Sequence, residues 1–420
     1  MSPAVLYRSR YLLPIATPPL EDAALLVAAG RIVAVGPGRD LAAAHPRAAV
    51  VDFGEAVILP PLVNAHAHLE LTAYPDWQAA TETGSPPTDF VEWIQQLVRV
   101  RRSVDAAAVR AALAAGLQQS LYAGSGAVGD ILTTLEAADA YAETPLRGRV
   151  FCEVLGLDPA RIAARLAVIS RLLGAPPGPA LGWGLSPHAP YTLSPATLAQ
   201  AHDFAVRHRL PTASHWAETR AEIEFLTSCQ GPFAEHLYPV VGWDLPVEPP
   251  GRDALLQFSG AAGSLLIHGV HAAASDLDTL AAKGVGLVLC PRSNSRFGGS
   301  RAPVAACRRA GVRLALGTDS RASSPSLSVW EELAFARDWF RGVLDPLAWL
   351  EIATVGGAAV LGLAERLGTL EPGREASFQV VAVPAAATRG TLPEALCAAG
   401  QAIAVMALFL DGENVLPPGL

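Results

Sequence analysis

The sequence VILPPLVNAHAHLEL, residues 57–71, combines an apolar run, a proline pair and a histidine pair. Alternate residues of a β-strand point to the same face, so His66 and His68 would lie side by side at the end of a strand. Neutral imidazole is the commonest metal ligand among protein side chains. The stretch therefore predicts a strand that ends in two ligands of one metal ion. Histidine pairs of this kind also occur on surfaces and in cores, so the rest of the chain has to support the interpretation.

Seven further apolar runs follow residues 56–68, and amphipathic segments rich in Ala, Leu and Arg lie between them. Repeated strand–helix units indicate parallel strands, and eight units fit an α/β fold of the TIM type, a (β/α)8 barrel. One intervening helix is expected to begin at Pro195, with Ser194 as its N-cap. A doubly wound open sheet is the alternative fold. The seven runs are residues 125–132, 149–157, 181–190, 211–218, 264–271, 285–294 and 312–320.

Both ends of the chain are predicted to be rich in β-structure, unlike the middle. Residues 24–36 form two apolar runs around Ala29-Gly30, which is typical of a β-hairpin. Residues 368–383 and 407–415 repeat this pattern around Pro-Gly and Asp-Gly turns. We therefore expect a small β-sandwich domain formed by both termini and a barrel between them: residues 1–56 with 366–420, and residues 57–365.

The composition limits the classes of partner. The formal net charge is −8, with 31 basic against 39 acidic residues, which disfavours binding to nucleic acid or to an anionic membrane. No apolar stretch reaches the roughly 18 residues of a transmembrane helix, and the N-terminus lacks the features of a signal peptide. Five scattered cysteines without CxxC spacing indicate reduced thiols. We expect a cytoplasmic protein that acts on a small molecule, and a homodimer is compatible with the fold.

The ends of the predicted strands carry a candidate metal site. Active sites of TIM-type barrels lie at the carboxyl ends of the strands, where this chain places His66, His68, His215 and Asp319. Three imidazoles and one carboxylate suit Zn²⁺, with Fe²⁺ as the alternative. The structural alternative for Asp319 is an Asx-turn or a helix cap. We expect one ion, because Lys283, the only lysine, precedes its strand and cannot bridge a second ion from the end of strand four.

Three further residues at strand ends are candidates for proton transfer and substrate contact. Glu218 lies three residues beyond His215, where it could pass protons between water and substrate. The alternative is a glutamate at a helix N-terminus, where the helix dipole stabilises its negative charge. His268 would steady the attacking hydroxide or the oxyanion, and His188 would donate to the substrate. The alternative for His268 is a buried histidine that is hydrogen-bonded to the backbone.

These segments resemble the signature blocks of the amidohydrolase superfamily, in its mononuclear branch of nucleobase and nucleoside deaminases and hydrolytic dechlorinases. The resemblance implies that His66, His68, His215 and Asp319 bind the metal ion, and that Asp319 also helps to activate water. It further implies that Glu218 and His268 carry protons and that His188 touches the substrate. The sequence HAH replaces the more usual HTH or HMH, and Ser377 stands where the family often has an acidic residue. The blocks are AVILPPLVNAHAHLEL, SPHAPYTLSP, SHWAETRAEIEFL, LIHGVH, LCPRSNSRFG and LGTDSRASSPSLSVWEEL.

Within this branch the chain is most similar to 6-aminodeoxyfutalosine deaminases, which act in menaquinone biosynthesis on an adenine nucleoside analogue that carries a benzoate. A carboxylate favours the fork of an arginine, and Arg292, Arg296 and Arg321 all follow the last two strands. Asn294 in the same segment is a further candidate for substrate contact. The alternative for each arginine is a solvated loop residue.

The sequence as a whole predicts a metal-dependent hydrolase that deaminates an aminopurine nucleoside and releases ammonia. One alternative is a related hydrolase that acts on S-adenosylhomocysteine, guanine, cytosine, a triazine or a cyclic amide. Another is a non-catalytic scaffold on the same barrel, but such proteins usually lose metal ligands. Phe90 and Trp93 could stack on an aromatic substrate, although core packing is the favoured interpretation.

Overall fold

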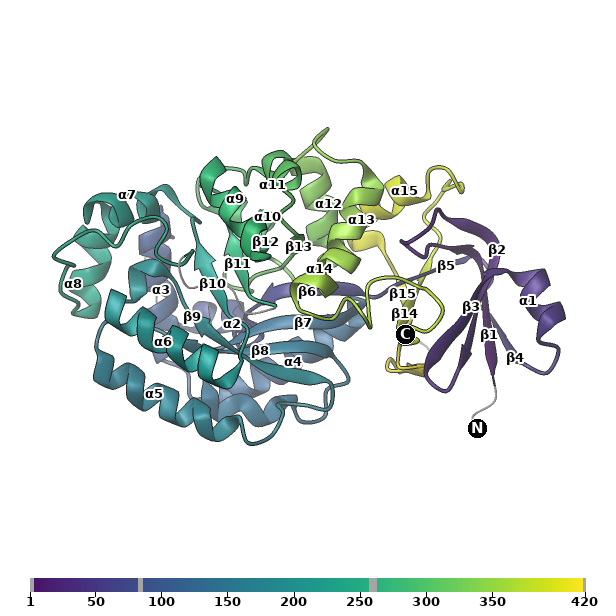
Figure 1. Ribbon diagram of the computed structural model, residues 1–420, viewed down its shortest axis with the longest axis horizontal. Helices are drawn as coiled ribbons and strands as arrows, with labels where there is room; N and C mark the ends of the chain where they lie inside the picture. The colour runs from purple at the N-terminus through teal and green to yellow at the C-terminus, as the bar shows by residue number, and fades with distance from the viewer. Residues whose placement is uncertain (1–3, 82–85, 257–262, 418–420) are drawn as a thin grey trace.

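The middle of the chain contains eight parallel strands in the computed structural model, which describes residues 4–81, 86–256 and 263–417 (Figure 1). They form two four-stranded sheets, and within each sheet the strands lie side by side in chain order. All eight predicted runs thus contain a strand. The first sheet contains β6 (Leu62–Ala67), β7 (Ser125–Leu132), β8 (Arg147–Val154) and β9 (Leu181–Pro187), and the second contains β10 (Ala213–Trp216), β11 (Leu265–His268), β12 (Gly286–Leu289) and β13 (Leu314–Leu316).

Single parallel bridges connect the edges of the two sheets. One pairs Leu185 of β9 with Thr212, and the other pairs Ala67 of β6 with Asp319. The described strands therefore form two sheets rather than the one closed sheet that we predicted, because β10 to β13 have only three or four residues each. The sequential order of parallel strands is TIM-barrel-like and differs from that of a doubly wound sheet.

The central strands share one apolar core. Val63 of β6, Phe151 of β8 and Val288 of β12 belong to a single cluster of buried side chains, which includes strands of both sheets. Almost every residue of the central strands is buried, as expected for parallel strands that are covered on both faces. The packing of side chains from both sheets against one another holds the strand ends, and the residues on them, at fixed distances.

Helices cover the outside of the central strands (Figure 1). The prediction that a helix begins at Pro195 is confirmed, because Ser194 and Thr197 form a capping box at its start. The longer helices are α3 (Phe90–Arg102), α4 (Ala106–Tyr122), α5 (Pro159–Leu172), α6 (Pro195–His208), α7 (Arg220–Ser228), α9 (Ala274–Lys283), α12 (Val329–Trp339) and α15 (Leu392–Ala399). Shorter ones are α1 (Gly38–Ala44), α2 (Tyr74–Ala80), α8 (Tyr238–Val241), α10 (Pro291–Arg296), α11 (Val304–Ala310), α13 (Pro346–Glu351) and α14 (Gly357–Val360).

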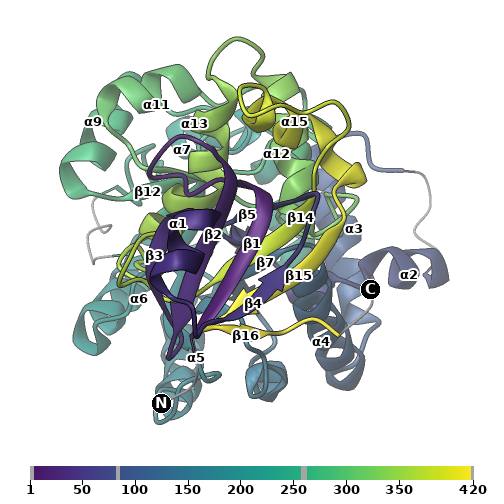
Figure 2. The ribbon, with the colours of Figure 1, turned by 90° about the vertical axis from the view of Figure 1, so that its right-hand side faces the viewer.

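The two chain termini build a third, eight-stranded sheet. Figure 2 shows strands from the N-terminus beside strands from the C-terminus. The order is β16-β15-β14-β5-β1-β2-β3, and β4 pairs with β1. Tyr7, Phe378 and Phe409 pack together, with ring centroids 4.4 to 5.0 Å apart. The strands are β1 (Val5–Leu12), β2 (Leu20–Ala28), β3 (Arg31–Pro37), β4 (Ala49–Asp52), β5 (Ala56–Leu59), β14 (Phe378–Ala382), β15 (Val405–Leu410) and β16 (Glu413–Asn414).

Two sequence interpretations differ from this sheet. The first apolar run is divided at Pro60-Pro61, so that β5 joins the terminal sheet while β6 joins the central strands. Proline lacks a backbone N–H, which explains the break between two strands. Of the two strands expected on either side of the Pro-Gly turn in residues 368–383, the second is present as β14, whereas the residues before the turn form no strand and Glu375 makes a single bridge to Arg31. The sandwich and its boundaries at residues 56 and 366 stay predictions.

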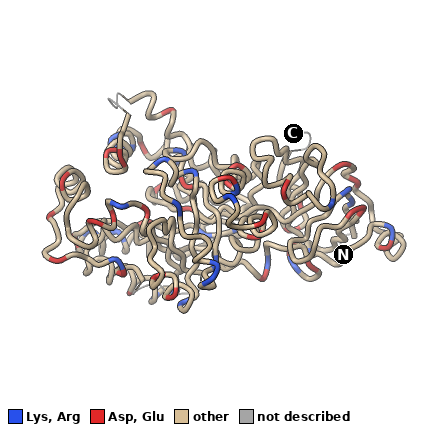
Figure 3. Tube along the Cα trace, turned by 90° about the horizontal axis from the view of Figure 1, so that it is seen from above, with Lys and Arg blue, Asp and Glu red and all other residues tan. Residues whose placement is uncertain are grey.

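The surface carries both signs of charge. Basic and acidic residues are interspersed along the trace in Figure 3. Among the described residues, no helix combines the length and the apolar character needed to cross a membrane. All five cysteines are free thiols, and four of them are buried.

Candidate active site

The four predicted metal ligands lie together at the carboxyl ends of three strands. The ring of His66 lies 4.9 Å from that of His68 and 5.1 Å from that of His215, measured between centroids. The Nε2 atoms of His68 and His215 are 3.2 Å apart. Oδ1 of Asp319 is 3.5 Å from Nε2 of His66 and 3.8 Å from Nε2 of His68. Residues more than 250 positions apart in the chain thus present their donor atoms to one small space.

The chemistry of this cluster fits a divalent cation. Both ring nitrogens of His66 are buried and have no hydrogen-bond partner within the described chain, which is costly unless another group satisfies them. Burial and the neighbouring His66 lower the pKa of His68 to about 3, and burial with the surrounding histidines lowers the pKa of His215 well below its usual value. Neutral imidazoles are the form that binds metal.

Asp319 supplies the negative charge of the cluster. Burial opposes its ionisation, but His66, His68 and His268 around it hold the pKa of Asp319 well below its usual range. Its Oδ2 atom accepts hydrogen bonds from the hydroxyls of Ser293 at 2.6 Å and Ser323 at 2.9 Å. Oδ1 is therefore left to face the histidines, as a metal ligand requires.

Local backbone geometry brings the end of β13 close to β6. The N–H of Asp319 donates to the carbonyl of His66 at 3.1 Å. A Cβ atom on Gly317 would lie within 2.9 Å of the backbone nitrogen of His66, so only glycine allows this approach. Asp319 and His268 both have positive φ, at 57° and 76°. Such strained conformations at non-glycine residues concentrate at functional sites.

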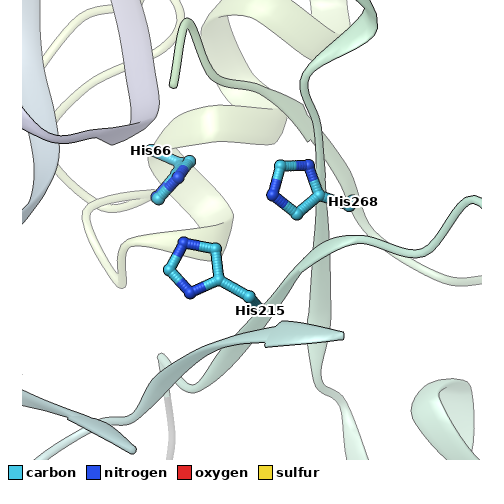
Figure 4. Close-up of side chains that lie close together, drawn as sticks. All are labelled: His66, His215 and His268. Atoms are coloured by element: carbon cyan, nitrogen blue, oxygen red, sulfur yellow. The ribbon is translucent and has the colours of Figure 1, made fainter. Parts of the chain in front are cut away.

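Glu218 and His268 form a second pair beside the cluster. Nε2 of His268 lies 3.5 Å from Oε1 of Glu218. Burial, together with the negative charges of Asp319 and Glu222, raises the pKa of Glu218 well above its usual value. A carboxyl group with a raised pKa can both accept and return a proton near neutral pH. Figure 4 shows the rings of His66, His215 and His268 converging from separate segments.

Asn294 lies behind His268. Its amide Nδ2 is 3.0 Å from Nδ1 of His268. Because an amide nitrogen only donates, Nδ1 accepts and the proton of the neutral ring is on Nε2, which faces Glu218. The amide nitrogen of Asn294 thus orients His268, and the predicted contact of Asn294 with the substrate stays a prediction.

His188 lies at the edge of the cluster, with its ring 4.8 Å from that of His215. Its Nδ1 atom is 2.9 Å from the hydroxyl of Thr192, and its Nε2 atom is 4.0 Å from Oε1 of Glu153. Sequence patterns did not point to Glu153. Its signal was an acidic residue inside the otherwise apolar end of β8, and its buried Oε1 atom has no hydrogen-bond partner among the described residues.

Glu222 is another acidic residue near the site to which no sequence pattern pointed. It accepts the backbone N–H groups of Ala217 and Glu218, both at 2.8 Å. Burial raises the pKa of Glu222 to about 7. The residue fixes the turn that carries Glu218.

The three predicted arginines differ in their surroundings. Arg292 is buried, and its guanidinium contacts Glu332 at 2.5 Å, Glu331 at 3.0 Å and the hydroxyl of Ser326 at 3.0 Å. These contacts occupy the fork that a substrate carboxylate would need. Arg296 is exposed and lines a cavity, and the buried Nε atom of Arg321 has no partner among the described residues.

The sequence of the chain matches the profile of a known protein family, in agreement with the fold and the site. The sequence profile of the Amidohydrolase family matches residues 57–415, and the chain therefore belongs to that family. A profile described as the imidazolonepropionase-like composite domain of bacteria matches residues 23–48. The predicted family is confirmed, and the chain is a hydrolytic enzyme of the deaminase kind that acts on C–N bonds.

Two named relatives are similar over most of the chain. An aminodeoxyfutalosine deaminase of Deinococcus radiodurans is 34% identical, covering 80% of this chain and 81% of the relative. A 5-methylthioadenosine/S-adenosylhomocysteine deaminase of Syntrophobacter fumaroxidans is 30% identical, covering 86% of this chain and 80% of the relative. The similarity to an aminodeoxyfutalosine deaminase agrees with the resemblance seen in the sequence.

Two solved structures share the fold. Helicobacter pylori aminofutalosine deaminase in complex with methylthio-coformycin has a TM-score of 0.87 at 23% identity, covering 98% of this chain and 100% of the other. An adenosine deaminase from Xanthomonas campestris with bound zinc has a TM-score of 0.77 at 25% identity, covering 98% of this chain and 92% of the other. The second of these neighbours thus binds a divalent metal ion in the same fold.

Proposed function

We propose that this chain deaminates an aminopurine nucleoside by hydrolysis, with 6-aminodeoxyfutalosine as its substrate and ammonia as a product. The observation that carries the proposal is Glu218, whose Oε1 atom lies 3.5 Å from His268 beside the cluster of three histidines and Asp319. The relative of 34% identity, an aminodeoxyfutalosine deaminase, supports this choice of substrate. The product would belong to menaquinone biosynthesis in the cytoplasm.

His66, His68, His215 and Asp319 would hold one divalent ion, Zn²⁺ or Fe²⁺. When bound, such an ion supplies the Lewis acidity that makes water nucleophilic near neutral pH. Two observations support this assignment: the donor atoms of His66, His68 and Asp319 lie within 4.8 Å of one another, and Nε2 of His215 is 3.2 Å from Nε2 of His68. We infer a single ion, because no described lysine lies near the cluster to bridge a second.

Glu218 performs the proton transfers in this mechanism. It takes a proton from the attacking water and delivers it to the ring nitrogen next to the amino-bearing carbon. The oxygen of water bonds to that carbon, and the C–N bond to the amino group then breaks. Ammonia leaves with the second proton of the water, which passes through Asp319. The raised pKa of Glu218 suits a group that must exist in both protonation states.

His268 and His188 orient the reacting groups. With its proton on Nε2, His268 donates toward the attacking oxygen from a position that Asn294 fixes. His188, held by Thr192, would donate to the substrate on the other side of His215. The burial of this constellation strengthens each of these interactions, because competing water is excluded.

An ammonia-release assay tests the proposal. The metal-loaded protein is given 6-aminodeoxyfutalosine beside adenosine, 5-methylthioadenosine, S-adenosylhomocysteine, guanine and cytosine. We expect selective release from 6-aminodeoxyfutalosine. Preferential release from 5-methylthioadenosine or S-adenosylhomocysteine would favour the second candidate, which the relative of 30% identity supports. No release from any of these amines would overturn the deaminase assignment in favour of ring-amide or carbon–halogen hydrolysis.

A further inference from the structure

A cavity of about 310 Å³ lies next to the candidate active site. It has two kinds of lining residue that bear on its ligand. Phe90, Trp93 and Phe297 are aromatic, whereas Arg220, Arg296 and His271 are basic or polar. The volume is at the lower end of the range for small-molecule sites, about 300 to 1,000 Å³, and suits one part of a substrate.

Short chain segments connect the lining of the cavity directly to the catalytic residues. Thr219 and Arg220 follow Glu218, and both line the cavity. His271 comes three residues after His268, and its backbone N–H donates to the carbonyl of Ala217 at 2.8 Å. A substrate that reaches Glu218 could therefore extend its far end into this cavity.

A third segment of the lining is tied to the same site. Arg296 and Phe297 lie at the end of α10, the helix that carries Asn294, and the N–H of Phe297 donates to the carbonyl of Asn294 at 3.2 Å. Trp93, which packs against Phe297, is held as well: its Nε1 donates to the carbonyl of Ala322 at 3.2 Å, three residues beyond Asp319. These bonds fix the position of the cavity relative to the residues that carry out the chemistry.

The cavity has an excess of positive charge. Within the described part of the chain, Arg220 and Arg296 have neither an ion pair nor a side-chain hydrogen bond. Asp89 is the acidic residue of the lining, but its carboxylate caps α3 by accepting the N–H groups of Val91 at 2.8 Å and Glu92 at 2.9 Å. Two free guanidinium groups at one cavity favour a carboxylate, which can accept two parallel hydrogen bonds from each.

The aromatic side chains offer a surface for a planar group. The ring centroids of Phe90 and Trp93 lie 5.5 Å apart, and Phe297 is 5.0 Å from Phe90 and 4.8 Å from Trp93. Phe90 and Trp93 are largely buried against one another, as core packing predicts, yet both reach the cavity. An aromatic ring of a ligand can stack or pack edge-on against such a cluster.

We propose that this cavity binds an aryl carboxylate, the end of the substrate that lies farthest from the amino group that is hydrolysed. Arg220 and Arg296 hold the carboxylate, and Phe90, Trp93 and Phe297 contact the ring. The inference rests on the proposed function and extends it, because it assigns the choice among nucleosides to named residues. A substrate with an uncharged thioether at this end would leave both arginines unpaired, and one with an added ammonium group would meet repulsion.

The test compares two substrates in Arg220→Gln and Arg296→Gln. For 6-aminodeoxyfutalosine we expect kcat/KM to fall about 10- to 100-fold in each variant, mostly through KM, as for the loss of a charge-assisted hydrogen bond. The fall for 5-methylthioadenosine should be at least tenfold smaller. Arg341→Gln is the matched control, because its side chain is 82% exposed and lies outside the cavity. Equal losses on both substrates, or no loss on either, would overturn the assignment.

A binding measurement separates this inference from the proposed function. Calorimetric titration of the metal-loaded protein with benzoate should give a dissociation constant that rises at least tenfold in Arg220→Gln and in Arg296→Gln. If no nucleoside is deaminated but benzoate binds in this manner, the proposed reaction fails and the aryl-carboxylate site stands. If nucleosides are deaminated while benzoate binds equally to all variants, the site is overturned and the reaction stands.

Discussion

His268 and Glu218 face each other beside the candidate metal site, with 3.5 Å between Nε2 of the imidazole and Oε1 of the carboxylate. Both residues are held by neighbouring side chains. Asn294 holds the other ring nitrogen of His268, and Glu222 holds the backbone N–H of Glu218. The site therefore contains a fixed proton donor and acceptor before any substrate arrives, which reduces the reorganisation that catalysis needs.

Replacing Glu218 by Gln should abolish proton transfer while it keeps the shape of the side chain. We expect deamination to fall by about 10²- to 10⁴-fold, the range for loss of a general acid–base group, with an unchanged metal content. Steady-state rates and metal analysis of the same sample measure both. Glu235→Gln is the matched control, since that side chain is 66% exposed. Full turnover in Glu218→Gln would contradict the mechanism.

Replacing His66 by Ala should remove the metal ion. The wild-type protein should contain one Zn²⁺ or Fe²⁺ per chain, and His66→Ala should contain much less, because His66 contacts both His68 and Asp319 in the cluster. Elemental analysis of the purified proteins measures this directly. Treating the wild type with a chelator should abolish activity, and added Zn²⁺ should restore it. The exposed His45→Ala variant serves as control; two ions per chain would argue against the single-ion assignment.

Asn294 should act through His268. Removing its amide in Asn294→Ala should lower kcat about tenfold, as is typical for a residue that orients an active-site group, with little change in KM. In Asn294→Asp the new carboxylate stabilises the protonated imidazole, which should shift the pH dependence of kcat to higher pH. A pH–rate profile of the three proteins distinguishes these effects. A rise in KM without a change of profile would instead support direct contact with the substrate.

Arg292 should contribute to stability rather than to substrate binding. It is buried against Glu331 and Glu332, so Arg292→Gln leaves buried charge without its partner. We expect the free energy of unfolding to fall by about 3 kcal/mol, measured by urea denaturation. Arg341→Gln, at an exposed arginine, should be nearly neutral. A stable Arg292→Gln protein with a raised KM only for carboxylate-bearing substrates would contradict this prediction.

Asp130 should make the stability depend on pH. Burial raises its pKa from 3.8 to about 8, so between these values the unfolded chain loses a proton that the folded protein keeps. The contribution of Asp130 to the free energy of unfolding should therefore decrease as the pH rises from about 4 to 8. Asp130→Asn removes this contribution, and urea denaturation at pH 5 and pH 8 should show a smaller difference than in the wild type. The exposed Asp278→Asn variant should retain the wild-type difference.

Patterns along the chain predicted much of the fold. Each of the eight apolar runs contains a central strand, and Ser194 caps its helix, because these features depend on neighbouring residues alone. Patterns could not separate β5 from β6, since both are apolar and continuous in sequence. Sequence patterns also could not decide whether the central strands close into one barrel. That depends on how far the short strands β10 to β13 pair with their neighbours.

The sequence by itself determined which side chains stand at strand ends, because the alternation of a strand and the direction of parallel strands follow from local pattern. Only the tertiary structure decided what those side chains do for one another. It brought His66 to Asp319, used Arg292 in a buried ion pair and left Arg220 and Arg296 at a cavity. The physical reason is that hydrogen bonds and ion pairs act over a few ångströms, and the partners here are separated by tens to hundreds of residues. Packing of the whole chain sets those distances.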